Sequence, residues 1–226
     1  MSKFSRRDGD RGENAELSRR TFLIGAAGAG FTLAFIDPRA VFADPAAALA
    51  NKLFEPTIWY QIDRDGIVTV NVIRAEMGQH VGTALARIVA DELEADWSSV
   101  RINAVDTDPK WGYMVTGGSW SVWQSFALLS QAAAAGRITL IEEGAKLLGA
   151  AASTCIARNS VVRAGGKSIG YADIVSKGNL TRVYSAAELA AMPIKNAADR
   201  RLIGLPTDAI DVPSKTNGTA LYGIDA

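Results

Sequence analysis

Cysteine and histidine are almost absent from this sequence of 226 residues, which contains one of each, Cys155 and His80. A single thiol forms no internal disulfide, so packing must hold the fold. Nor can it supply the roughly four thiolates of an iron–sulfur cluster or a cysteine zinc site. A single histidine excludes a multi-histidine metal site, and a Ser-His-Asp triad would have to use His80. We expect Cys155 to be a buried small hydrophobe; a reactive thiol is the alternative.

A net charge is also lacking, because 24 lysines and arginines balance 24 acidic residues. Residues 1–43 hold seven basic and five acidic residues, which leaves 17 basic and 19 acidic residues in the remainder. A slightly negative chain lacks the basic face that nucleic acid requires. The composition therefore predicts no nucleic-acid partner and no polybasic membrane patch.

The apolar run near the N-terminus, residues 23–35, has 13 residues, whereas a membrane span needs about 20. Arg19 and Arg20 precede this run, and small residues suited to signal peptidase follow at Val41 and Ala43. This pattern predicts a twin-arginine export signal over residues 1–43. The alternatives are a membrane or core helix and an uncleaved anchor. Export by this route predicts a periplasmic location. Because the twin-arginine route carries folded proteins, a complex cofactor inserted in the cytoplasm is also expected.

Apolar spacing beyond the signal predicts an α+β fold with mixed α/β layers, β-hairpins and long helices. Asp65-Gly66 is expected to close one hairpin and Gly165-Gly166 another. The long helix contains Gly136 and Gly144, which weaken it and favour a break. The expected strands are 57–62, 67–73 and 100–105, with a hairpin over 160–169; the expected helices are 81–94, 121–148, 171–177 and 188–192, and the chain from 195 onward is expected to be extended.

The first polar loop, residues 76–83, leaves a strand and enters a helix N-terminus. Unpaired N–H groups and the positive end of the helix dipole suit an anion there. Gly78 permits close backbone approach, and Gln79 offers an amide to a polar ligand. An ordinary β–α loop is the alternative interpretation.

The second loop, residues 116–121, places Gly117 and Gly118 before hydroxyl residues at a helix start. Paired glycines in this position form a cradle for an anion. Ser119 or Ser121 would serve equally as a plain helix N-cap. Three tryptophans nearby are expected either to wall a pocket or to cover the helix: Trp111, Trp120 and Trp123.

Taken in order, these motifs resemble the molybdopterin-binding large subunit of the xanthine oxidase (molybdenum hydroxylase) family. The similar branch is the exported isoquinoline 1-oxidoreductase beta-subunit or aldehyde dehydrogenase type. The resemblance runs from the leader to the last residue. It is carried by Glu76-Met77-Gly78-Gln79, Thr83-Ala84-Leu85, Ala90-Asp91-Glu92-Leu93, Asp96-Trp97, Thr116-Gly117-Gly118-Ser119-Trp120-Ser121, Leu202-Ile203-Gly204-Leu205-Pro206 and Tyr222-Gly223-Ile224-Asp225.

The resemblance implies that both loops line a molybdopterin cytosine dinucleotide. Gly78, Gln79 and Thr83 would hydrogen-bond this cofactor. The glycine-rich loop would place Gly118 beside the metal. Gly117, Ser119 and Ser121 complete the expected cofactor-binding set. No residue of the chain is expected to ligate the metal or to be catalytic. One position departs from the family: a glycine usually follows the glutamine, and here it is His80.

The resemblance also implies a division into parts. Residues 44–210 would form the N-terminal portion of a molybdopterin-binding domain, and 211–226 the start of a truncated hammerhead-type domain. We expect a truncated gene product or one half of a split large chain, inactive alone. The full enzyme would oxidise aldehydes or N-heterocycles with water-derived oxygen. Its partners would be the remainder of the large subunit and a small [2Fe-2S] subunit, with a c-type cytochrome as a further candidate. An exported interaction protein without cofactor is the alternative.

Export is predicted to depend on the arginine pair. Replacing both residues by lysine, Arg19→Lys with Arg20→Lys, keeps the charge but removes the planar guanidinium groups. The double variant should accumulate in the cytoplasm as a precursor, which cell fractionation and intact-mass measurement would detect. Normal periplasmic appearance of the double variant would contradict the export signal.

Overall fold

The computed structural model describes residues 54–225, with the side chains of 54–56 left undescribed. The predicted export signal, residues 1–43, lies outside the described residues, as does most of the alanine-rich segment that follows it. Secondary structure between residues 54 and 225 mixes helices and strands, which confirms the α+β fold class.

The first sheet in the described part of the chain has the strand order β1-β2-β3-β4. β2 pairs with β3 in antiparallel register, and β3 pairs with β4 in parallel register after a crossover through helix α3. Val68, Val70 and Val72 of β3 are buried, as their alternation with polar residues predicts. The strands are β1 (Phe54–Thr57), β2 (Tyr60–Ile62), β3 (Val68–Val72) and β4 (Val100–Ala104), and α3 is Val81–Leu93.

The single strand expected over residues 57–62 is wrong, because the chain reverses within it. β1 ends at Thr57 and β2 begins at Tyr60, and the two pair antiparallel. The Thr57 hydroxyl accepts a hydrogen bond from the Trp59 N–H at 3.3 Å. A side-chain bond of this local kind competes with strand pairing and favours a turn.

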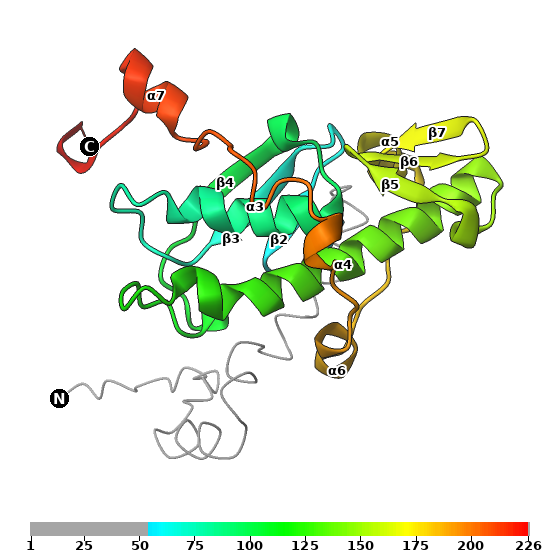
Figure 1. Ribbon diagram of the computed structural model, residues 1–226, viewed down its shortest axis with the longest axis horizontal. Coiled ribbons are helices and arrows are strands. Elements are labelled where there is room, and N and C mark those ends of the chain that lie inside the picture. Colours follow the sequence, from blue (N-terminus) through cyan, green and yellow to red (C-terminus); the bar gives the residue numbers. More distant parts are fainter. Residues whose placement is uncertain (1–53, 226) are drawn as a thin grey trace, which may run out of the picture. The chain divides into compact units, whose positions relative to one another are not determined.

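A second sheet, ordered β5-β6-β7, forms an antiparallel meander beside helix α5 (Figure 1). Its β6–β7 hairpin turns at Gly165-Gly166, as expected. The strands are β5 (Ile156–Arg158), β6 (Val161–Ala164) and β7 (Lys167–Gly170), followed by α5 (Tyr171–Lys177); the remaining helices are α4 (Ser121–Leu148), α6 (Ala186–Ala190) and α7 (Val212–Asn217), with 3₁₀ turns at Trp97–Ser99, Pro109–Trp111, Ala152–Thr154, Ala197–Asp199 and Gly223–Asp225.

The short elements after residue 185 differ from expectation. The helical turn expected over 188–192 lies at Ala186–Ala190, because Ser185 and Glu188 form a capping box that starts the helix earlier. Helix α7 was missed in a segment expected to be extended. Its proline at the first turn and Gly218 at its C-cap are ordinary helix-end signals.

Helix α4 is one continuous helix of 28 residues, so the expected break at its glycines is wrong. Both glycines are points of close contact. A Cβ at Gly136 would lie 1.7 Å from the Tyr60 hydroxyl oxygen, and a Cβ at Gly144 would lie 3.0 Å from Ile174. Consequently α4 packs against α3 and the first sheet with one half and against the second sheet with the other (Figure 1). None of the helices between residues 54 and 225 is long and apolar enough to cross a membrane.

Residues 195–211 run antiparallel alongside helix α3. Polar side chains spaced three and four residues apart on α3 and its N-cap hold this segment. Asp91 accepts the backbone N–H groups of Arg201, Leu202 and Ile203 at 2.8–3.2 Å. In the same way Arg87 donates to the carbonyls of Leu202 and Leu205, Thr83 accepts from the Ile210 N–H, and His80 contacts Asp211. We call residues 195–211 the strap.

Glu92 gives the strap a second attachment beside Asp91. Its buried carboxylate accepts the Lys195 N–H at 3.0–3.1 Å and pairs with Arg137 of α4 at 3.0 Å. Burial by itself would raise the pKa of Asp91, but the backbone N–H groups of the strap hold it below its usual value. A carboxylate with a lowered pKa stabilises the fold as long as it is ionised.

Substitution of Gly136 tests the packing of α4. Gly136→Ala should lower the free energy of unfolding by about 3 kcal/mol, because overpacking a filled core costs about 1–3 kcal/mol and the Tyr60 hydroxyl must also move. Removing that hydroxyl should relieve the clash. Tyr60→Phe combined with Gly136→Ala should therefore be more stable than Gly136→Ala alone in urea unfolding. Equal stability of wild type and Gly136→Ala would show that α4 does not approach Tyr60 so closely.

The strap should loosen in acid. The contribution of Asp91 is complete above about pH 4, the unfolded value, and is lost as the pH falls through the lower folded value. Asp91→Asn should cost about 1.5–3 kcal/mol at pH 7, the range for hydrogen bonds to a charged group. Asp173→Asn is the control, since Asp173 is half-exposed and paired with Lys177. Urea unfolding at pH 7 and pH 3 gives the free energy of unfolding of each variant. Equal losses of stability in Asp91→Asn and Asp173→Asn would contradict the role of Asp91 in holding the strap.

Candidate functional site

The two candidate loops lie side by side, as expected from the sequence. The backbone N–H of Ala75 donates to the Thr116 hydroxyl at 2.8 Å. One residue earlier, the Arg74 guanidinium donates to the carbonyls of Tyr113 and Val115. The residues just before the first loop are therefore bonded to the start of the second loop and to the segment that leads into it.

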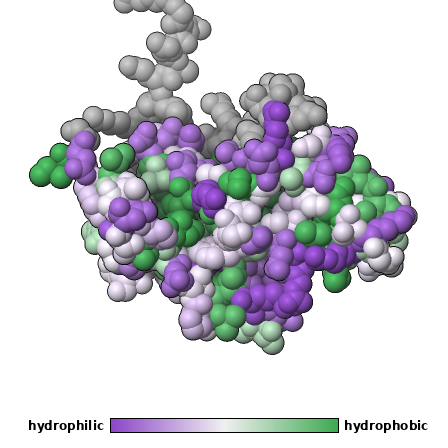
Figure 2. Space-filling model, turned by 90° about the horizontal axis from the view of Figure 1, so that it is seen from above, coloured by the Kyte–Doolittle hydropathy of each residue, from purple (hydrophilic) through white to green (hydrophobic). Residues whose placement is uncertain are grey.

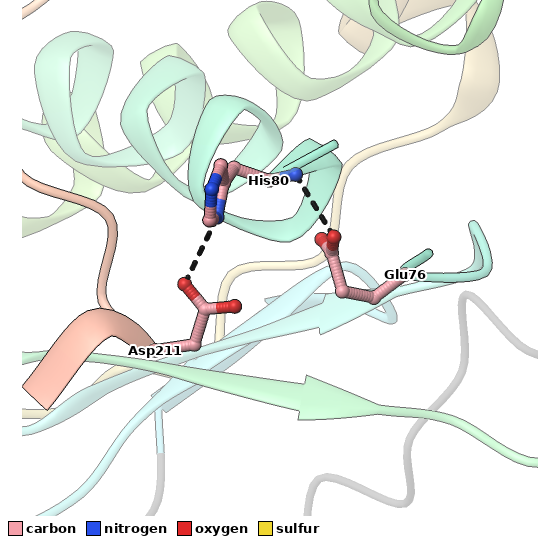
Figure 3. A group of neighbouring side chains, drawn as sticks. All are labelled: Glu76, His80 and Asp211. Carbon is pink, nitrogen blue, oxygen red and sulfur yellow. Dashed lines mark hydrogen bonds and ion pairs between the residues drawn. The ribbon is translucent and has the colours of Figure 1, made fainter. Parts of the chain in front are cut away.

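The first loop carries a carboxylate of its own, that of the exposed Glu76. Glu76 accepts the His80 N–H at 2.8 Å (Figure 3). It also accepts the N–H of Gly78 at 2.9 Å and that of Gly82, in the first turn of α3, at 3.3 Å. Burial opposes ionisation, but these N–H donors lower the pKa of Glu76 overall. The anion site expected at the start of α3 is thus filled by the chain itself.

The other expected ligands of the first loop also have partners within the chain. Gln79 turns back on its own loop, donating to the Ala75 carbonyl at 2.8 Å and accepting from the Met77 N–H. Thr83 is buried, and its hydroxyl accepts from the Ile210 N–H of the strap at 3.1 Å. Gly78 remains exposed with open space around its Cα.

His80 occupies the left-handed backbone region, with φ 58°. Glycine adopts this conformation without steric cost, which gives a physical reason for the glycine usual at this place. The His80 ring contacts Asp211 through Nδ1 at 3.2 Å (Figure 3). Donor atoms of Glu76, His80 and Asp211 lie within 4.8 Å of one another, a set that suits a divalent cation. These atoms are already engaged, because Lys215 pairs with Asp211 and three N–H groups bind Glu76.

The second loop is open where the first is filled. Helix α4 starts after Trp120 with no side chain capping it, so neither Ser119 nor Ser121 is its N-cap. No atom lies within 4 Å of a Cβ built on Gly117, and the atoms nearest to a Cβ built on Gly118 belong to the Trp120 ring, at 3.5–3.7 Å. An uncapped helix N-terminus behind an unobstructed glycine leaves backbone donors available for an anionic ligand.

The three tryptophans do not wall one pocket. Trp111 is buried against Trp59, with ring centroids 6.0 Å apart, and Trp120 stands edge-on to Tyr113 at 6.0 Å. The side chains of Trp123 and Met77 are largely exposed, at 77 % and 72 %. Figure 2 shows a face on which apolar residues form separate patches among hydrophilic ones.

Cys155 is a buried free cysteine, as expected.

Sequence reasoning missed the side chains that build the two loops, Arg74 and Glu76. Arg74 lies two residues after the end of the buried strand β3 and is only 4 % exposed. Burial lowers the pKa of its guanidinium. An arginine that closely follows a strand of alternating valines is a weak signal, because the sequence does not reveal its partners 39–50 residues away.

Curated relatives resemble this chain along almost its whole length. A membrane-bound aldehyde dehydrogenase [pyrroloquinoline-quinone] of Gluconacetobacter polyoxogenes is 55 % identical over 97 % of this chain and 29 % of its own length. The beta chain of isoquinoline 1-oxidoreductase from Brevundimonas diminuta is 29 % identical over 94 % of this chain and 32 % of its own. The chain therefore spans less than a third of these relatives.

Two further matches are shorter. A nicotinate dehydrogenase chain of Pseudomonas putida is 27 % identical over 74 % of this chain and 14 % of its own length. The crystal structure of quinoline 2-oxidoreductase from Pseudomonas putida 86 is 29 % identical, covers 51 % of this chain and 15 % of its own, and has a TM-score of 0.44. The sequence model of the molybdopterin cofactor-binding domain family matches residues 11–201, which is most of the chain. The chain belongs to the molybdopterin cofactor-binding domain family.

Proposed function

We propose that this chain is the N-terminal, cofactor-binding part of an exported molybdenum hydroxylase. The whole enzyme would oxidise aldehydes or N-heterocycles with oxygen derived from water, in line with the names of its relatives. When bound, the molybdopterin group would supply the two-electron redox chemistry. The cytosine dinucleotide form and export by the twin-arginine route are part of this proposal.

The open second loop is the observation that supports cofactor binding. Gly117 and Gly118 leave room for a ligand, and the uncapped start of α4 offers backbone N–H donors to phosphate. Ser119 and Ser121 add hydroxyl donors next to these groups. The chain's own contribution is therefore to bind and orient the anionic part of the cofactor.

The first loop would play a supporting part. Because Glu76 fills the start of α3, this loop offers side chains such as Gln79 rather than free backbone donors. Gln79 would exchange its bonds to Ala75 and Met77 for bonds to the cofactor. Thr83 would act indirectly by anchoring the strap.

Partners follow from the same proposal. The small [2Fe-2S] subunit would accept electrons, and a c-type cytochrome is a candidate for the next transfer. The single cysteine agrees with this arrangement, since an iron–sulfur cluster needs about four thiolates from elsewhere. The remainder of a large subunit would complete the substrate site.

A second candidate function is an exported interaction protein that has no cofactor. The internal bonds of Glu76, Gln79 and Thr83 favour it, because they satisfy the first loop without a ligand. The name of the Gluconacetobacter relative also raises pyrroloquinoline quinone as a rival cofactor. Extraction of the native-host complex, with mass spectrometry of the released compound and metal analysis, separates molybdopterin, quinone and no cofactor.

Gly117 provides a direct test of the second loop. Gly117→Leu should leave the urea midpoint unchanged, because its Cβ meets nothing within 4 Å and its backbone is not left-handed. Molybdenum content per chain should fall about tenfold, equivalent to about 1.4 kcal/mol of lost affinity. Ala187→Leu, on an exposed position of α6, is the matched control. Wild-type molybdenum content in Gly117→Leu, measured by plasma mass spectrometry, would rule the second loop out as the cofactor site.

A further inference from the structure

Arg74 is a buried side chain that reaches from just beyond the end of β3 to the segments on either side of the second loop. Its Nη1 donates to the carbonyl of Tyr113 at 3.2 Å and to that of Val115. Its Nη2 donates to the side-chain oxygen of Gln124, in the first turn of α4, at 3.2 Å. One guanidinium thus joins the backbone that leads into the loop to the helix that follows the loop.

Charge makes this arrangement unusual. Arg74 takes part in no ion pair with the acidic side chains of residues 57–225, and its acceptors there are neutral oxygens. Its Nε is buried without a hydrogen-bond partner, and the residue lines a cavity of about 30 Å³. A buried charge without a counter-charge is costly. Such a group is held in place only by several well-directed bonds, which the fixed fork of arginine provides.

The bonds of Arg74 and its neighbour fix residues 113–116, the stretch that leads into the second loop. Arg74 binds Tyr113 and Val115, and the N–H of Ala75 binds Thr116 at 2.8 Å. Thr116 immediately precedes Gly117, where the open part of the loop begins. The path of the chain into the glycines is therefore set by Arg74 and Ala75, which lie two and three residues after the end of β3.

We propose that Arg74 is the positioning residue of the cofactor site, holding the second loop in the shape that receives an anionic ligand. This rests on the proposed function, because the ligand is the phosphate-bearing cofactor assigned there. Arg74 acts through the carbonyls of Tyr113 and Val115, just before the loop, and does not touch the ligand. Its uncompensated positive charge also favours an anion close to the loop.

The test compares Arg74→Met and Arg74→Lys in the full chain with Arg101→Met. Arg101 is a suitable control because it is exposed and donates to the carbonyls of Ser98 and Val100 nearby in sequence. Hydrogen exchange of cofactor-free protein should be about tenfold faster across residues 111–121 in Arg74→Met, whereas β6 and α5 keep wild-type protection. Arg74→Lys should restore part of this protection, since an ammonium can serve one carbonyl but lacks the fork.

Cofactor content gives the second readout, measured as molybdenum per chain in the complex from the native host. Faster local exchange in Arg74→Met together with lost molybdenum supports the proposal. Exchange equal to that of Arg101→Met overturns it, as does faster exchange with full molybdenum content. Wild-type protein without molybdenum would refute the proposed function instead, and the exchange data would then still decide whether Arg74 positions the loop.

Discussion

The close approach of helix α4 to both sheets is the contact on which the arrangement of this chain depends. Gly136 lets the helix backbone meet Tyr60 of the first sheet, and Gly144 lets it meet Val162 and Ile174 beside the second. The buried alanines 132–135 extend this smooth surface. The Tyr60 hydroxyl in turn donates to the Ala132 carbonyl at 3.3 Å. Because α4 starts directly after the second loop, the same packing fixes where the open helix N-terminus lies.

Helix α3 adds polar contacts to this apolar packing, because its polar side chains bind the strap. Its polar face, from His80 to Asp91, binds the strap mainly through the backbone N–H and carbonyl groups of the strap, and also through the side chains of Lys195 and Asp211. Asp91 and Glu92 are fully buried yet satisfied, because each accepts hydrogen bonds from the strap. A buried carboxylate is tolerated under these conditions only. The strap consequently belongs to the folded unit even though it has little secondary structure of its own.

The two loops are unequal, although each follows a sheet strand and precedes a helix. The first carries its own anion, the Glu76 carboxylate, at the helix N-terminus. The second presents glycines and an uncapped helix N-terminus. Arg74 binds the backbone that leads into it. Of the two loops, the second therefore leaves backbone N–H donors available for an anionic ligand, whereas the backbone donors of the first are taken by Glu76.

Local sequence determined the elements whose signals are local. Alternating valines predicted β3, the 3,4 spacing of apolar residues predicted α3, and paired glycines predicted the β6–β7 turn, because each depends on neighbours within a few residues. The motif order also indicated the family. Membership is now supported by the match over residues 11–201.

Tertiary structure alone decided the roles of particular side chains. Gly136 and Gly144 resemble helix breakers in sequence, but packing against distant side chains keeps α4 intact. Glu76 belongs to a ligand motif in sequence, yet it closes the helix end that was expected to be free. Arg74 gave no clear signal, because its partners lie 39–50 residues away. Periodicity predicts which residues are buried; which buried or polar groups meet depends on long-range contacts that only the folded chain forms.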